Sequence, residues 1–140
     1  MEMLTRELET AAAVSELDNV IDFVDGQLEA VGCSIDSQMQ IELAVEEIFV
    51  NIASYAYAPG IGNAAIKIRI YGEPPTVEIT FTDHGVRYDP LAKEDPDIDL
   101  PAGEREVGGL GIFLAKKNMD EMAYEYRDGM NIFTIKKVIN

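Results

Sequence analysis

The sequence contains few cysteines, histidines and basic residues. Its 140 residues include one cysteine, Cys33, and one histidine, His84. A single cysteine has no intramolecular partner, so disulfides do not contribute to the fold, and a reducing compartment such as the cytoplasm is expected. The histidine has no metal-ligating partners at a recognisable spacing, which argues against a zinc site built on it. We expect His84 to lie in a solvent-facing loop.

Basic residues are outnumbered by acidic ones, 11 against 26, which gives a formal net charge of −15. A surface this acidic repels phosphate backbones and anionic lipids, so direct binding of nucleic acid or of a membrane is not expected. Apolar runs long enough for a membrane span or a signal peptide are also missing. The composition predicts a soluble cytoplasmic protein in which backbone amides, helix N-termini and a metal ion would hold any anionic ligand.

The hydrophobic content of 47% and the length fit a single domain over residues 1–140. The spacing of apolar residues predicts, in chain order, an edge strand within 1–13, a helix from a Ser15 N-cap to Gly32, a helix from Asp36 or Ser37 to Pro59, strands over 65–71 and 76–82, a shorter helix after Gly111, and strands over 122–126 and 131–139. This order predicts an α+β two-layer sandwich, a mainly antiparallel sheet covered on one face by three helices. A doubly wound parallel sheet is excluded because helices and strands do not alternate.

A long stretch after the second predicted hairpin strand has no apolar periodicity. Residues 84–107 are rich in Asp, Glu, Pro and Gly. So long an irregular segment inside a compact domain is typical of a functional loop, and we predict a mobile lid over about residues 90–108.

The second predicted helix carries a carboxylate and an amide beside its apolar stripe. Glu47 and Asn51 are four residues apart, so their side chains stack on one edge of the helix and could converge on one ligand. From this helix alone, a solvated edge is the simpler interpretation.

Two further motifs have chemical as well as structural interpretations. Asp83 follows a strand and could accept a hydrogen bond from an exocyclic amine, while Gly85 would let a flat ring approach the backbone; an ordinary turn explains the pair equally well. Gly108-Gly-Leu-Gly111 precedes a helix, where successive N–H groups and the helix dipole can hold phosphate, although a hinge has the same composition. It is not a Walker loop, because no Gly-Lys-Ser/Thr follows.

Taken together and in this order, the three motifs resemble the GHKL superfamily of ATP-binding domains, shared by histidine kinases and type II topoisomerases. The sequence is most similar to its small, single-domain anti-sigma-factor serine/threonine kinases. The likeness extends over nearly the whole chain and includes Asp89-Pro90 and the closing Gly129-Met-Asn131 before an Ile-Phe-Thr-Ile-Lys strand. One departure is Arg87, at a position where family members often have a second glycine.

The resemblance implies a site residue by residue. Glu47 would be the general base, Asn51 the Mg²⁺ ligand and Asp83 the partner of the adenine amino group. The other residues that it assigns to ATP are Gly85, Arg105, Gly108, Gly109, Leu110, Gly111 and Thr134, with Gly85 against the ring, Arg105 near the γ-phosphate and Thr134 in the adenine pocket.

The implied function is that of a Mg²⁺-ATP-dependent kinase that binds a sigma factor and phosphorylates an anti-sigma-factor antagonist on serine, and that forms a homodimer. Two alternatives stay open. One is a non-catalytic ATP-binding module, which would need Asn51 but no base at Glu47. The other is a detached histidine-kinase catalytic domain, whose phosphoacceptor histidine would have to come from another protein.

Overall fold

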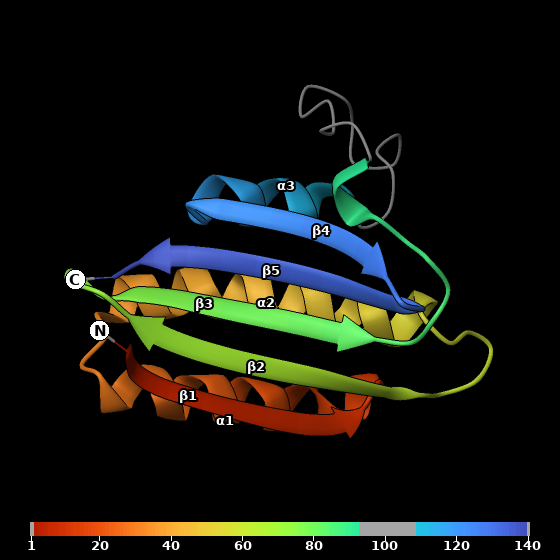
Figure 1. Ribbon diagram of the computed structural model, residues 1–140, viewed down its shortest axis with the longest axis horizontal. Coiled ribbons are helices and arrows are strands. Elements are labelled where there is room, and N and C mark those ends of the chain that lie inside the picture. Colours follow the sequence, from red (N-terminus) through yellow and green to blue (C-terminus); the bar gives the residue numbers. More distant parts are fainter. Residues whose placement is uncertain (1, 93–108, 140) are drawn as a thin grey trace.

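Five antiparallel strands form a single sheet with the order β1-β2-β3-β5-β4 (Figure 1). The structure is a computed structural model that describes residues 2–92 and 109–139. Its strands are β1 (Glu2–Ala11), β2 (Asn63–Tyr71), β3 (Thr76–Asp83), β4 (Glu121–Arg127) and β5 (Met130–Val138), and its helices are α1 (Leu17–Ala30), α2 (Ile35–Tyr55), α3 (Gly109–Asn118) and the short 3₁₀ turns η1 (Val14–Glu16) and η2 (Pro90–Ala92). The predicted α+β architecture and the N-terminal edge strand are confirmed. None of the described helices is long and apolar enough to cross a membrane.

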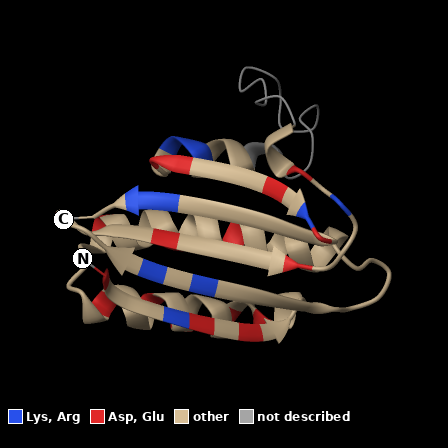
Figure 2. Cartoon of the chain, viewed as in Figure 1, with Lys and Arg blue, Asp and Glu red and all other residues tan. Residues whose placement is uncertain are grey.

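Strict alternation along the strands separates an apolar face from a polar one. On β2, Ile66, Ile68 and Ile70 are fully buried, and β3 and the first part of β5, as far as Ile135, bury every second residue in the same way. The three helices lie on this apolar side (Figure 1). Charged residues recur along the strands (Figure 2). On the side of the sheet away from the helices, Glu78 pairs with Arg69 at 3.1 Å and with Lys136 at 3.8 Å.

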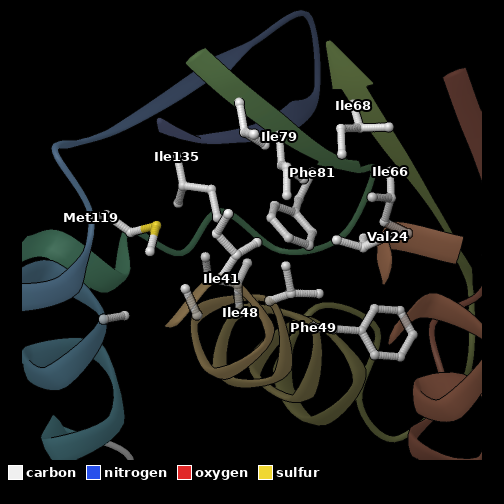
Figure 3. Close-up of a cluster of buried hydrophobic side chains, with 14 of the residues drawn as sticks. Val24, Ile41, Ile48, Phe49, Ile66, Ile68, Ile79, Phe81, Met119 and Ile135 are labelled. Carbon is white, nitrogen blue, oxygen red and sulfur yellow. The ribbon is translucent and has the colours of Figure 1, made fainter. Parts of the chain in front are cut away.

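Helix α2 is the central element of the core. Figure 3 shows Ile41, Ile48 and Phe49 of this helix among side chains from the sheet and from α1. Each fully buried side chain of this size contributes about 1.5–3 kcal/mol relative to leaving it in water. Because α2 is packed along most of its length, polar side chains on its flanks have fixed positions, and these include Glu47 and Asn51.

The helix boundaries differ from the sequence prediction at both ends. Ser34 is the N-cap of α2 and accepts a hydrogen bond from the Ser37 amide at 3.2 Å, so the predicted caps Asp36 and Ser37 already lie within the first turn. A Ser15 cap is also wrong, because Ser15 sits inside η1 and α1 begins at Leu17 without a side-chain cap. Helix α2 ends at Tyr55, before Pro59. The backbone carbonyl of the next residue, Ala56, accepts a hydrogen bond from the Val86 amide at 2.7 Å. Tertiary contact at Ala56 therefore accompanies the end of the helix.

Helices α1 and α2 face each other through two carboxyl groups, Asp25 and Glu42. The pKa of Asp25 is raised from 3.8 to about 7, first by burial and then by a hydrogen bond with Glu42 and the negative charge of Glu42. The charge of Glu29 adds to this shift, and a hydrogen bond from Gln38 opposes it. Asp25 Oδ1 is buried without a hydrogen-bond partner among the described residues. The folded protein thus takes up a proton here more readily than the unfolded chain does.

This pair predicts an unusual pH dependence of stability. Because the pKa is raised on folding, the stability that Asp25 contributes is present below pH 3.8, falls as pH rises towards about 7, and is lost above that value. Between pH 5 and pH 8, the free energy of unfolding of an Asp25→Asn variant should therefore rise relative to that of the wild type. The expected rise is on the order of 1 kcal/mol, after allowance for the partial exposure of Asp25. Thermal unfolding at both pH values measures this gain.

Asp22→Asn, one turn earlier on the exposed side of α1, is the matched control and should show the same difference from wild type at both pH values. A pH-independent effect of Asp25→Asn would contradict the proposed carboxyl pair.

Candidate functional site

A pocket that opens to solvent lies between the C-terminal half of α2 and the adjoining ends of β3 and β5. It is lined by Ile48, Asn51, Ile52, Tyr55, Ala56, Phe81, Asp83, Val86, Tyr88, Pro90, Tyr124, Asn131 and Phe133. Only three polar or charged side chains in the described part of the chain are buried, Asn51, Asp83 and Asn131, and all three line this pocket. A mostly apolar pocket with a few convergent polar groups is the usual form of a small-molecule site.

Asp83 is the last residue of β3, and its side chain is 4% exposed. Its Oδ1 accepts hydrogen bonds from the Gly85 amide at 2.8 Å and from Asn131 Nδ2 at 2.9 Å. Within the described residues nothing donates to Oδ2. The carboxylate is thus held in place through one oxygen, and the second is left as an acceptor for a ligand.

Asn131 holds the loop after β3 against β5, and sequence reasoning did not assign it to the site. Its Nδ2 also donates to the Val86 carbonyl at 2.9 Å, and its Oδ1 accepts from the Tyr88 amide at 3.1 Å and from the Tyr124 hydroxyl. It is paired with Asp83 across the strands. The sequence does indicate its position, because Asn131 is a polar residue that alternates in step with the apolar Phe133 and Ile135 and so belongs to the buried face of β5.

Thr134 does not contribute to this pocket, and the prediction that it completes the adenine site is wrong. It lies between buried Phe133 and Ile135 on β5, so its side chain points to the uncovered face of the sheet. There its hydroxyl lies 3.4 Å from that of Thr80, and it lines a separate polar hollow with Glu78 and Lys136.

Gly85 makes a close approach within the protein. A Cβ at this position would lie 2.2 Å from the carbonyl oxygen of Ala56, at the end of α2. The side of Gly85 that a Cβ would occupy is therefore filled by Ala56, the residue after α2, and the predicted contact of Gly85 with a flat ring stays a prediction. Only a residue without a side chain lets the loop approach the helix this closely.

The two other notable residues of this loop point away from the pocket. Arg87 is exposed, and its guanidinium lies 5.4 Å from the centre of the Tyr126 ring. The departure from the family pattern at Arg87 therefore does not place a bulky side chain among the lining residues. His84 is exposed, as predicted, and its backbone amide donates to the Tyr57 hydroxyl at 2.8 Å.

Glu47 lies where α3 begins to pack on α2. Helix α3 starts at Gly109, earlier than the predicted start after Gly111, so Gly109, Leu110 and Gly111 form its first turn. A Cβ on Gly111 would lie 2.1 Å from Glu47 Oε2. Burial and the negative charge of Glu46 raise the pKa of Glu47, while a hydrogen bond with Asn51 opposes the shift. A carboxylate with a raised pKa is a better proton acceptor than a solvated one.

Some of the predicted site lies outside the described residues. These are Arg105, Gly108 and the lid predicted over about 90–108, except for its first residues, which form η2.

A model of the histidine kinase-like ATPase domain matches residues 10–137. The chain belongs to this family. Two curated relatives of this histidine kinase-like ATPase domain are serine kinases by name. This chain is 30% identical over 95 residues to the serine/threonine-protein kinase BtrW of Bordetella bronchiseptica, and the match covers 68% of this chain and 66% of that protein. It is 28% identical over 117 residues to the serine-protein kinase RsbW of Bacillus cereus, covering 81% and 72%.

Two solved structures share the fold. A crystal structure of the RsbU and RsbW domains of a Mycobacterium tuberculosis protein aligns with a TM-score of 0.66 and 14% identity, over 98% of this chain and 33% of that one. The SiaB–SiaC complex of Pseudomonas aeruginosa aligns with a TM-score of 0.58 and 18% identity, over 99% and 91%.

A Mg²⁺ ion is implied by the resemblance, and the residues present fit it in a limited way. The Asn51 amide offers an oxygen of the hard type that Mg²⁺ prefers, and Glu47 is beside it. No group of three or more potential metal ligands occurs among residues 2–92 and 109–139. This donor set suits a metal that takes its other ligands from phosphates and water, as Mg²⁺ does in nucleotide sites, and not a metal held by protein alone.

Proposed function

We propose that this chain is a Mg²⁺-ATP-dependent protein kinase that transfers the γ-phosphoryl group of ATP to a serine or threonine hydroxyl. The observation that carries the proposal is the gathering of the buried polar side chains Asn51, Asp83 and Asn131 in one pocket, with Glu47 one turn from Asn51. The serine-kinase names of the relatives BtrW and RsbW support the type of reaction.

ATP binding would use groups from three parts of the chain. Asp83 Oδ2 would accept a hydrogen bond from the adenine amino group, and the apolar pocket walls would cover the ring. The backbone N–H groups of Gly109, Leu110 and Gly111, at the start of α3, would bind phosphate oxygens together with the helix dipole. Arg105 and Gly108 keep their proposed roles beside the phosphates. Asn51 would hold Mg²⁺, which neutralises developing charge on the phosphates when bound.

Phosphoryl transfer would use Glu47 as the general base. The carboxylate takes the proton of the acceptor hydroxyl, the hydroxyl oxygen forms a bond to the γ-phosphorus, and the bond from phosphorus to the bridging oxygen breaks to release ADP. The proximity of Gly111 to Glu47 supports this role, because a module that only binds ATP would not require a carboxylate beside the phosphate-binding residues.

The partners that we propose are a sigma factor, an anti-sigma-factor antagonist as phosphoacceptor, and a second copy of the chain in a homodimer. Incubation with radiolabelled ATP, Mg²⁺ and an antagonist encoded beside this gene should give acid-stable label on serine. Acid-labile label on histidine would favour a detached histidine-kinase domain, and bound ATP without transfer would favour a non-catalytic module.

Asn51→Ala should abolish the dependence of ATP affinity on Mg²⁺. The variant keeps Asp83 and the adenine pocket but lacks the amide oxygen for the metal, so its ATP dissociation constant with Mg²⁺ should equal that with EDTA. Isothermal titration calorimetry measures both values.

Thr134→Val, on the opposite face of the sheet, is the control and should retain the wild-type response to Mg²⁺. An Asn51→Ala variant with the same Mg²⁺-dependent affinity as the wild type would place the metal elsewhere.

A further inference from the structure

A second groove lies on the outer side of α2, against α3. It opens to solvent and is lined by Leu43, Glu46, Glu47, Val50, Gly111 and Leu114. It shares no lining residue with the pocket of Asn51 and Asp83. The candidate base Glu47 therefore opens to a different surface from the one through which the adenine pocket is reached.

An apolar stripe leads along α2 into this groove. Ile35, Met39 and Leu43 are 76%, 60% and 48% exposed, and steps of four residues place them on one side of the helix. Leu114 of α3, 40% exposed, lies at the end of the stripe in the groove wall. Single exposed apolar side chains are ordinary, whereas aligned ones beside a groove indicate a surface for a protein partner.

The charge of the groove specifies the partner further. Its lining contains two carboxylates, Glu46 and Glu47, and no basic residue among those described. Glu46 is exposed and close enough to Glu47 for its charge to raise the pKa of that group. A positively charged side chain on the occupant would complement Glu46, and a negatively charged one would be repelled both locally and by a chain of net charge −15.

We propose that this groove binds the phosphoacceptor segment of the partner protein: an apolar stretch that contacts Leu43, Val50 and Leu114, with a lysine or arginine next to the acceptor serine that pairs with Glu46. This inference rests on the proposed kinase function and adds the sequence class of its substrate. The serine hydroxyl enters from the groove and gives its proton to Glu47. The adenine of ATP occupies the pocket on the other side of α2, and the phosphates of ATP reach the start of α3, where Gly111 forms part of the groove wall. Asn51 lies one helical turn, about 5–6 Å, from Glu47, so the two substrates meet at adjacent residues of α2.

The test is a library of peptides with one fixed serine and varied neighbours, offered to the full chain with radiolabelled ATP and Mg²⁺. Wild type should label peptides with lysine or arginine beside the serine and leucine, isoleucine or methionine nearby about tenfold faster than peptides with glutamate there. Glu46→Lys should invert the charge preference, and Leu43→Ser should remove the apolar one. Two controls make the same kinds of change at exposed residues away from the groove: Asp22→Lys on α1 for the charge reversal, and Ile61→Ser in the loop before β2 for the loss of an apolar side chain. Both controls should leave the two preferences unchanged.

The ATP dissociation constant is measured for every variant, so that a loss of nucleotide is separated from a loss of acceptor. Serine labelling without these preferences, or preferences that Glu46→Lys and Leu43→Ser do not alter, would overturn the groove assignment and leave the kinase proposal intact. Labelling of the antagonist protein with no labelling of any peptide would also overturn the groove assignment alone. Bound ATP with no labelling of either the antagonist or any peptide, or no ATP binding at all, would overturn the kinase function and this inference with it.

Discussion

Replacing Glu47 with glutamine should slow phosphoryl transfer by roughly 10²- to 10⁴-fold, the range typical of a lost general base. Glutamine has nearly the same shape, so contacts with Gly111 and Asn51 should persist and ATP should still bind. The amide cannot accept the hydroxyl proton. Transfer of radiolabelled phosphate from bound ATP in a single turnover measures the chemical step directly.

The pH profile separates this role from a structural one. Because the pKa of Glu47 is raised, wild-type transfer should fall as pH falls through that raised value, when the carboxylate becomes protonated. The Glu47→Gln variant should lack this acidic limb. Glu121→Gln, an exposed carboxylate on β4, serves as the control and should retain both the rate and the profile. A Glu47→Gln enzyme with the wild-type rate would remove Glu47 from the mechanism.

Replacing Asp83 with asparagine should weaken ATP binding by roughly 10- to 100-fold, the cost of about 1–3 kcal/mol for a mismatched buried polar contact. The amide oxygen can still accept from the Gly85 amide and from Asn131 Nδ2, so the loop should keep its place. In place of Oδ2, however, the variant presents an N–H donor to the adenine amino group, which is also a donor.

Inosine triphosphate makes this prediction specific, because it carries a carbonyl oxygen where ATP carries the amino group. Wild type should prefer ATP, and Asp83→Asn should reduce or reverse the ratio of the two affinities, measured by equilibrium dialysis. An unchanged ratio would show that Asp83 does not contact the base. Thr134→Val should behave as wild type, because Thr134 faces the other side of the sheet.

Much of the fold follows from local periodicity. The isoleucines of β2 alternate with Lys67 and Arg69, and this pattern is enough to place one face of the strand in the core. Helix ends were less predictable because tertiary contacts act there. The α2 boundary lies at Tyr55, next to the Ala56 carbonyl that binds the Val86 amide from a distant loop, a contact that no local pattern encodes.

The site residues show the same division. Glu47 and Asn51 could be paired from helical spacing, and a resemblance suggested Asp83. The resemblance alone puts Thr134 in the adenine pocket, but the alternation of β5 places its side chain on the opposite face of the sheet from Asn131. Asn131 was overlooked because an asparagine after a turn looks ordinary until its pairing with Asp83 across the sheet is known. The role of Gly85 needed the three-dimensional approach of Ala56.

The central claim is that Asn51 and Asp83 bind opposite ends of one ATP molecule. A crystal structure of the full chain with Mg²⁺ and a non-hydrolysable ATP analogue tests it most directly. We expect the adenine amino group within hydrogen-bond distance of Asp83 Oδ2, and the metal bound to the Asn51 side-chain oxygen and to phosphate oxygens. A nucleotide bound outside the pocket of Asn51, Asp83 and Asn131, or a metal without Asn51 as ligand, would contradict the account.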